Sequence, residues 1–292
     1  MSKIKKAGCV LLILSIIEIA FSHTMLKVYA EEMIEDKDYK EIIANEIQLF
    51  ENESIDKSDL EKCKQILLEA GTPNEVLEDS SDEQIEFIAR HLKEGEKYES
   101  VDNYEFESEL VNNGISTYSL SSLSDKLIRI TIICYSYKNN GETQYRFFPS
   151  FRWLSTNYGI KNDSFGFALY DGWEVVPGMP AQIAVYLKNS YGTTKSQIYY
   201  PIDASQYGYA YNFTAGSSVP NGYYEGHAVF YARKKKTNAT NGITMKYVHD
   251  NSSWLSSISY GLSIGPASIS VSSDSSKLQV YSNNMTFAIS YK

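Results

Sequence analysis

From about residue 125 onward the chain alternates apolar and polar residues in short runs separated by turn residues. Around Ser257–Ile264, for example, serine and glycine alternate with isoleucine, tyrosine and leucine. A two-residue period places successive side chains on opposite faces of a β-strand. Roughly ten or more such runs predict an antiparallel β-sandwich or jelly roll over residues 125–292. The runs are 126–138, 145–153, 165–170, 182–188, 207–213, 224–233, 243–249, 258–264, 269–271, 277–281 and 285–291.

The part before this region carries helix start signals. Ser58-Asp-Leu-Glu61 and Thr72-Pro-Asn-Glu75 each fit a capping box, and a third segment begins at Ser80 or Ser81. Ile85, Ile88, Ala89 and Leu92 then recur at helical spacing, and Gly71 and Gly95 are suitable stops. The sequence therefore predicts an α+β fold, with a small N-terminal acidic helical unit (31–95), a linker (96–124) and the β-sandwich domain (125–292).

The charge is distributed unevenly along the chain. The net charge is −9, yet residues 31–110 hold 26 acidic and 8 basic residues, whereas residues 111–292 hold 9 acidic and 15 basic residues. Such a split favours two units with different roles. In one interpretation the acidic faces are only solvated helix surfaces. In the other, the acidic unit is a prosegment that masks the β domain in cis and is cut off in the linker.

The N-terminus resembles a secretory signal peptide. A basic start, MSKIKK, precedes an apolar run that ends near Phe21, and Val28 and Ala30 suit a cut after residue 30. We therefore expect residues 1–30 to be removed and the protein to be secreted to the extracellular medium. Cys63 and Cys134 then remain, and either one bridge or two thiols is compatible with their positions.

Residues 207–213 read YGYAYNF and place four rings on one strand face: Tyr207, Tyr209, Tyr211 and Phe213. Such a face either packs in the core or forms a platform on which sugars or lipid headgroups stack. Because a buried tyrosine needs a partner for its hydroxyl, three tyrosines favour a partly wet face. We therefore take these four residues as candidate binding residues.

A second candidate is the basic cluster Arg233, Lys234, Lys235 and Lys236, which follows a predicted strand and should cap an exposed hairpin. Clustered cations attract anionic lipids or polymers, although a solvated loop has the same composition. Nucleic acid is not an expected partner, because the region is only mildly basic and export separates it from such partners.

Catalytic signatures are missing from the sequence, which contains no G-x-S-x-G, H-E-x-x-H or Gly-rich phosphate motif. Glu225 and His227 share one strand face, a spacing that an acid/base or metal pair uses, but a strand histidine is more often a satisfied partner in a polar network. Glu225 with Asp171 or Glu174 would be a glycosidase-like pair. We expect no enzyme, no cofactor and no metal.

Four stretches resemble parts of large secreted bacteriocins of the geobacillin type from Gram-positive bacteria: residues 166–178, 223–235, 244–254 and 258–272. The resemblance covers most of the β region and carries no functional residue across. It implies a released antibacterial protein made with an N-terminal portion that is removed.

These observations lead to three functional hypotheses. The first is a secreted, non-enzymatic, bacteriocin-like effector that acts at bacterial cell envelopes through glycan or anionic lipid. The second is a carbohydrate- or surface-binding module without toxicity. The third is a pore former that inserts the serine-alternating segment 256–272 as an amphipathic hairpin, although its strands are shorter than the roughly 9–11 residues that a spanning strand needs.

Overall fold

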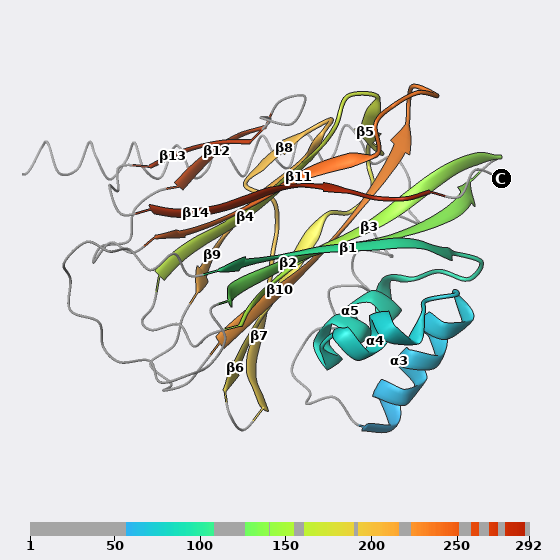
Figure 1. Ribbon diagram of the computed structural model, residues 1–292, viewed down its shortest axis with the longest axis horizontal. Helices are drawn as coiled ribbons and strands as arrows, with labels where there is room; N and C mark the ends of the chain where they lie inside the picture. The colour runs from blue at the N-terminus through green and yellow to red at the C-terminus, as the bar shows by residue number, and fades with distance from the viewer. Residues whose placement is uncertain are drawn as a thin grey trace, which may run out of the picture. The chain divides into compact units, whose positions relative to one another are not determined.

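The computed structural model describes residues 57–107, 126–139, 141–154, 161–189, 192–215, 223–250, 258–262, 269–273 and 278–289, all within one compact unit (Figure 1). The predicted signal peptide, residues 31–56 and most of the predicted linker lie outside the described residues. The fold is α+β, with antiparallel sheets and a group of helices near the N-terminal end, as the sequence predicts.

The strands form two large sheets and one small one, and every pairing is antiparallel. The first sheet has the order β1 (Lys97–Glu107), β2 (Lys126–Asn139), β3 (Glu142–Trp153), β10 (Tyr223–Lys234), β6 (Gln182–Asn189), β7 (Gly192–Tyr199), and β5 (Trp173–Val175) pairs with the end of β10. The second has the order β14 (Leu278–Thr286), β11 (Gly242–Asp250), β4 (Lys161–Leu169), β9 (Gly208–Ala215), β8 (Asp203–Ser205). The third pairs β12 (Ile258–Leu262) with β13 (Ile269–Ser273).

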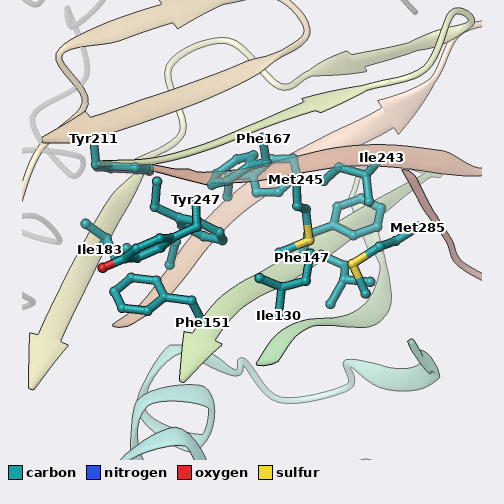
Figure 2. Close-up of a cluster of buried hydrophobic side chains, with 14 of the residues drawn as sticks. Ile130, Phe147, Phe151, Phe167, Ile183, Tyr211, Ile243, Met245, Tyr247 and Met285 are labelled. Atoms are coloured by element: carbon teal, nitrogen blue, oxygen red, sulfur yellow. The ribbon is translucent and has the colours of Figure 1, made fainter. Parts of the chain in front are cut away.

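The core lies between the two large sheets and is rich in aromatic rings (Figure 2). Phe151 of β3 contacts Tyr247 of β11 with ring centroids 4.6 Å apart, and Phe230 of β10 stacks on Phe167 of β4 at 4.7 Å. Each such ring removes a large apolar area from water and adds a favourable ring–ring contact. The period-two pattern of the sequence thus corresponds to the inner faces of a sandwich.

The outer face of the first sheet carries the helices α3 (Lys57–Glu69), α4 (Asn74–Asp79) and α5 (Asp82–His91). Phe87 of α5 is buried against Phe148 of β3, with ring centroids 6.3 Å apart. β2 is therefore buried on both faces, as its near-continuous apolar sequence predicts, with Ile130 in the core and Tyr135 towards the helices.

The structure corrects the domain boundary at the start of the sheet. Lys97–Glu107 was expected within the linker, but it forms β1, a strand at the edge of the first sheet. A register shift between Tyr98 and Ser100 breaks the two-residue period, which explains why the sequence pattern did not reveal the strand.

The helix starts are partly as predicted. Ser81 is the N-cap of α5, and its hydroxyl accepts a hydrogen bond from the Gln84 amide at 3.2 Å. The second capping box is wrong, because the hydroxyl of Thr72 lies 2.8 Å from the hydroxyl of Tyr135, and Pro73 is the N-cap of α4. A tertiary hydrogen bond has replaced the local one that the motif indicates.

Cys63 and Cys134 are both free thiols, which decides between the two alternatives that the sequence left open. No helix among the described residues has both the length and the apolar character needed to cross a membrane.

Candidate functional site

The aromatic face of β9 points into the sandwich. Tyr211 has no exposed surface (Figure 2). Phe213 is buried too, and its ring stacks on that of Phe151 with centroids 5.4 Å apart. Tyr207 and Tyr209 are half-buried, and Tyr209 packs against the core. Tyr211 and Phe213 therefore cannot belong to an external platform, because the strand face on which they lie turns towards the core.

The hydroxyl of Tyr211 shows why the reasoning from tyrosine failed. This oxygen is buried and has no hydrogen-bond partner among the described residues. The lack of a partner costs about 1–3 kcal/mol, less than the burial of the ring contributes together with its contact with Phe167. Tyrosine in an alternating strand therefore did not indicate a wet face.

The basic cluster lies at the end of β10 and in the turn that follows, as expected, but acidic residues neutralise most of it. Arg233 Nε donates to Glu174 Oε1 at 2.7 Å, and Lys235 Nζ lies 3.2 Å from the same oxygen. Lys236 Nζ donates to Asp171 at 2.7 Å. Although burial opposes it, the contacts with Arg233 and Lys235 hold the pKa of Glu174 below its ordinary value. The remaining member, Lys234, lies 6.0 Å from the Trp173 ring centroid.

The glycosidase-like pair is also wrong. Glu174 pairs in register with Arg233, whereas Glu225 lies eight residues earlier on the same strand. Eight residues of a strand span about 26 Å, far beyond the roughly 5–9.5 Å that separates glycosidase carboxyl groups. Asp171 lies at the same end as Glu174, where it binds Lys236.

A pocket of about 170 Å³ opens elsewhere, between the helices and the outer face of the first sheet. Helices α4 and α5 form one wall, and strands β1, β2, β3 and β10 form the other. Six polar side chains among those that line it are Glu75, Asp79, Gln84, Arg129, Arg152 and His227.

Strand register brings the polar side chains of the sheet together in two rows. Arg129 of β2 is opposite Arg152 of β3, which is opposite Glu225 of β10. The next row on the same face holds Thr131, Ser150 and His227. Because these residues are two positions apart on each strand, their side chains share the outer face of the sheet.

Ion pairs hold the two arginines in place. Arg129 donates from Nε to Glu105 Oε1 at 2.7 Å and from Nη1 to Asp79 Oδ1 at 2.6 Å. Arg152 donates from Nε to Glu225 Oε2 at 3.0 Å, and Glu225 is fully buried. The hydrogen bond between Arg129 and Asp79 also fastens the C-terminal end of α4 to the sheet, so the pocket walls are joined.

His227 differs from the other described histidines. His91 and His249 are satisfied members of polar networks, as expected of most buried histidines, through Phe87 and Gln182 for His91 and through Asp163 for His249. His227 is only 2% exposed, yet neither ring nitrogen has a hydrogen-bond partner among the described residues. Its Nε2 lies 3.6 Å from Glu225 Oε1.

This geometry suits binding of a polar ligand. Guanidinium, amide and imidazole groups offer donors, and carboxylates offer acceptors. The buried ring of His227 finds, among the residues that the structure describes, none of the hydrogen-bond partners that a buried polar group normally has. The sequence identified Glu225 and His227 as neighbours but not Arg129, Arg152 or Asp79. The sequence feature that could have indicated Arg129 and Arg152 is that each arginine lies inside an apolar run, LIRIT and SFRWL respectively.

Comparisons with known proteins give no family. No protein-family model and no curated protein matches the sequence. Among solved structures, the chain is similar to a pore forming protein (7% identity, TM-score 0.36, covering 65% of this chain and 92% of that one). It is also similar to Clostridium perfringens delta-toxin (8% identity, TM-score 0.31, covering 66% and 94%). A tailspike protein of bacteriophage CBA120 matches at a TM-score of 0.22, with 13% identity over 50% of this chain and 18% of that one. TM-scores this low establish neither a shared fold nor a shared function.

Proposed function

We propose that this chain is a secreted, non-enzymatic protein that acts at bacterial cell envelopes by binding a hydroxyl-rich glycan group in the pocket between the helices and the first sheet. One observation carries the proposal: His227, a buried imidazole with no hydrogen-bond partner in the described part of the chain, faces a pocket whose arginines are held in place by ion pairs. Sugar hydroxyls both donate and accept hydrogen bonds, and therefore match such a mixed lining.

The pocket takes over the role that the sequence suggested for the aromatic strand and the basic hairpin. Tyr211 and Phe213 are inaccessible, and the hairpin cations have acidic partners. The acidic helices supply Glu75, Asp79 and Gln84 to the pocket, so their removal would leave the site incomplete. The helical unit is then part of the binding protein, and the activity at the cell envelope belongs to the uncut protein.

The test is binding of the secreted protein to purified Gram-positive cell walls. His227→Phe keeps a ring between Phe87 and Tyr186 and removes both ring nitrogens. We expect it to weaken binding about tenfold or more, because up to two hydrogen bonds worth about 1 kcal/mol each are lost. The matched control, Lys235→Gln with Lys236→Gln, alters the hairpin and leaves the pocket intact. Equal binding by His227→Phe and the wild type would refute the proposal. Loss of cell-wall binding in the lysine variant alone would show that the basic hairpin, and not the pocket, binds the cell wall.

Pore formation is the second candidate, favoured by the hairpin β12–β13. These strands pair only with each other among the described strands and belong to neither large sheet. A hairpin that is not part of a larger sheet can detach with the loss of few backbone hydrogen bonds. The measurement is membrane depolarisation of Gram-positive cells: depolarisation by the wild-type protein would support a pore former, and binding without depolarisation would support the binding protein alone.

A further inference from the structure

Carboxylates outnumber guanidinium groups at the pocket. Among the described residues, four carboxylates and two guanidinium groups either line it or pair with its arginines: Glu75, Asp79, Glu105 and Glu225, with Arg129 and Arg152. Both arginines already have carboxylate partners, so the pocket is not an unoccupied cationic site.

This balance disfavours an anionic ligand. An incoming carboxylate or phosphate would have to compete with Asp79 and Glu105 for Arg129, and with Glu225 for Arg152. It would also lie close to an excess of negative charge in a partly buried place, where water screens repulsion less than at an open surface. A neutral hydroxyl-rich group neither competes with the carboxylates for the arginines nor is repelled by the negative charge.

The hydrogen-bonding needs of His227 point the same way. A neutral imidazole has one N–H donor and one nitrogen acceptor, and both positions of His227 lack partners among the described residues. Hydroxyl groups can accept from the first and donate to the second. A carboxylate or phosphate oxygen only accepts, so the charged group of an acidic ligand cannot itself donate to the accepting nitrogen.

We infer that the pocket selects a single uncharged or cationic sugar residue over an acidic one, and that α4 sets this preference. The inference rests on the proposed function and names the ligand class of the same site. The volume of about 170 Å³ suits one ring better than a chain, because pockets for larger ligands run from about 300 to 1,000 Å³.

The role of α4 follows from where its acidic residues lie. Glu75 and Asp79 line the pocket, whereas the exposed Glu78 on the same helix does not. Asp79 is hydrogen-bonded to Arg129, so Glu75 is the carboxylate that can be neutralised without breaking a described ion pair at the site. Part of the acidic charge of the helical segment thereby sets which ligands the pocket prefers, and does not serve to shield the β domain.

The experiment titrates the secreted protein with three probes that share one ring: glucose, glucosamine with its protonated amine, and glucuronic acid. The readout is the ring-proton resonance of His227 in the NMR spectrum, assigned by its absence in His227→Phe. At low ionic strength we expect glucose and glucosamine to shift this resonance and glucuronate to bind about tenfold more weakly. Glu75→Gln should reduce the preference for glucose over glucuronate about threefold, and Glu78→Gln should leave it unchanged.

Each outcome decides a different claim. Tightest binding by glucuronate would overturn the inference and leave a sugar-binding pocket, and therefore the proposed function, in place. Selectivity as expected but equal in Glu75→Gln and the wild type would overturn the assignment to α4. If none of the three sugars shifts the His227 resonance at concentrations up to saturation of the solution, both the inference and sugar binding at this pocket are refuted.

Discussion

Arg146 and Glu96 form an ion pair at 3.0 Å with both side chains at most 1% exposed. Arg146 lies on β3, and Glu96 immediately precedes β1, so the pair fastens the end of the helical segment to the first sheet. The guanidinium also lies 4.5 Å from the ring centroid of Tyr231. The two charged groups are close but poorly aligned, and the nitrogens of Arg146 lack hydrogen-bond partners among the described residues.

Removing one member of this pair should destabilise the fold strongly. Glu96→Gln leaves the buried guanidinium uncompensated, for which we expect a loss of about 3–5 kcal/mol in the free energy of unfolding. The double variant Glu96→Leu with Arg146→Met removes both charges and should recover most of that loss. Urea denaturation measures both. A loss below about 1 kcal/mol in the single variant would mean that the guanidinium finds another partner or water.

Burial lowers the pKa of His91 from 6.5 to about 4, and this should make stability depend on pH. The neutral ring with its proton on Nδ1 satisfies both neighbours, since it donates to the Phe87 carbonyl at 2.7 Å and accepts from Gln182 Nε2 at 3.0 Å. Between about pH 4 and pH 6.5 the unfolded chain binds the extra proton. The contribution of His91 to the free energy of unfolding is therefore complete above pH 6.5. It is lost as the pH falls towards 4, by about 3 kcal/mol in total.

The variant His91→Gln isolates this effect from the titration of the many carboxylates. It retains a polar side chain but cannot take up the proton, so its stability should vary less with pH than that of the wild type in this window. Denaturation midpoints measured from pH 4 to 7 give the two slopes. Parallel pH profiles for the two proteins would show that His91 is not the group responsible.

Two buried tyrosines should respond oppositely to loss of the hydroxyl. Tyr211→Phe removes an oxygen without a described partner and should be neutral or stabilise the protein by up to about 1 kcal/mol. Tyr247→Phe removes an oxygen that accepts from Trp153 Nε1 at 3.0 Å and donates to Asp163, and should cost about 1–3 kcal/mol. Thermal and chemical denaturation test this comparison, and a marked loss of stability in Tyr211→Phe would contradict it.

Neutralising the acidic partners of the basic hairpin should create the membrane affinity that the sequence suggested. Asp171→Asn with Glu174→Gln releases Lys235 and Lys236 from their ion pairs, whereas Arg233 loses Glu174 and keeps Glu142, whose Oε2 lies 3.4 Å from its Nη1. We expect about a tenfold gain in binding to vesicles that contain anionic lipid, since each cation near such a surface contributes about 1 kcal/mol. Co-sedimentation measures the gain, and neutral vesicles are the control. Equal binding by variant and wild type would show that the pairs do not limit the hairpin.

The strand pattern was largely predictable because burial on one face imposes a two-residue period. The expected strands at 165–170, 182–188, 207–213, 224–233 and 243–249 correspond to β4, β6, β9, β10 and β11. The sequence missed β7, β5 and β8, and it divided β14 into two strands. β5 and β8 are three residues long, too short to show a period, and the exposed residues of β14 interrupt its apolar pattern.

The amino-acid sequence alone determined the class of fold, the order of helices before strands, and which side chains share a face of each strand. Those properties follow from local backbone geometry and from burial. Only the tertiary structure decided which face is inside, since alternation is the same for a core face and an exposed platform, as Tyr211 shows. The strand register across β2, β3 and β10 likewise determined which side chains line the pocket. It brings Arg129, Arg152 and His227 together from residues far apart in the chain, and their charge balance depends on the helix that packs beside them.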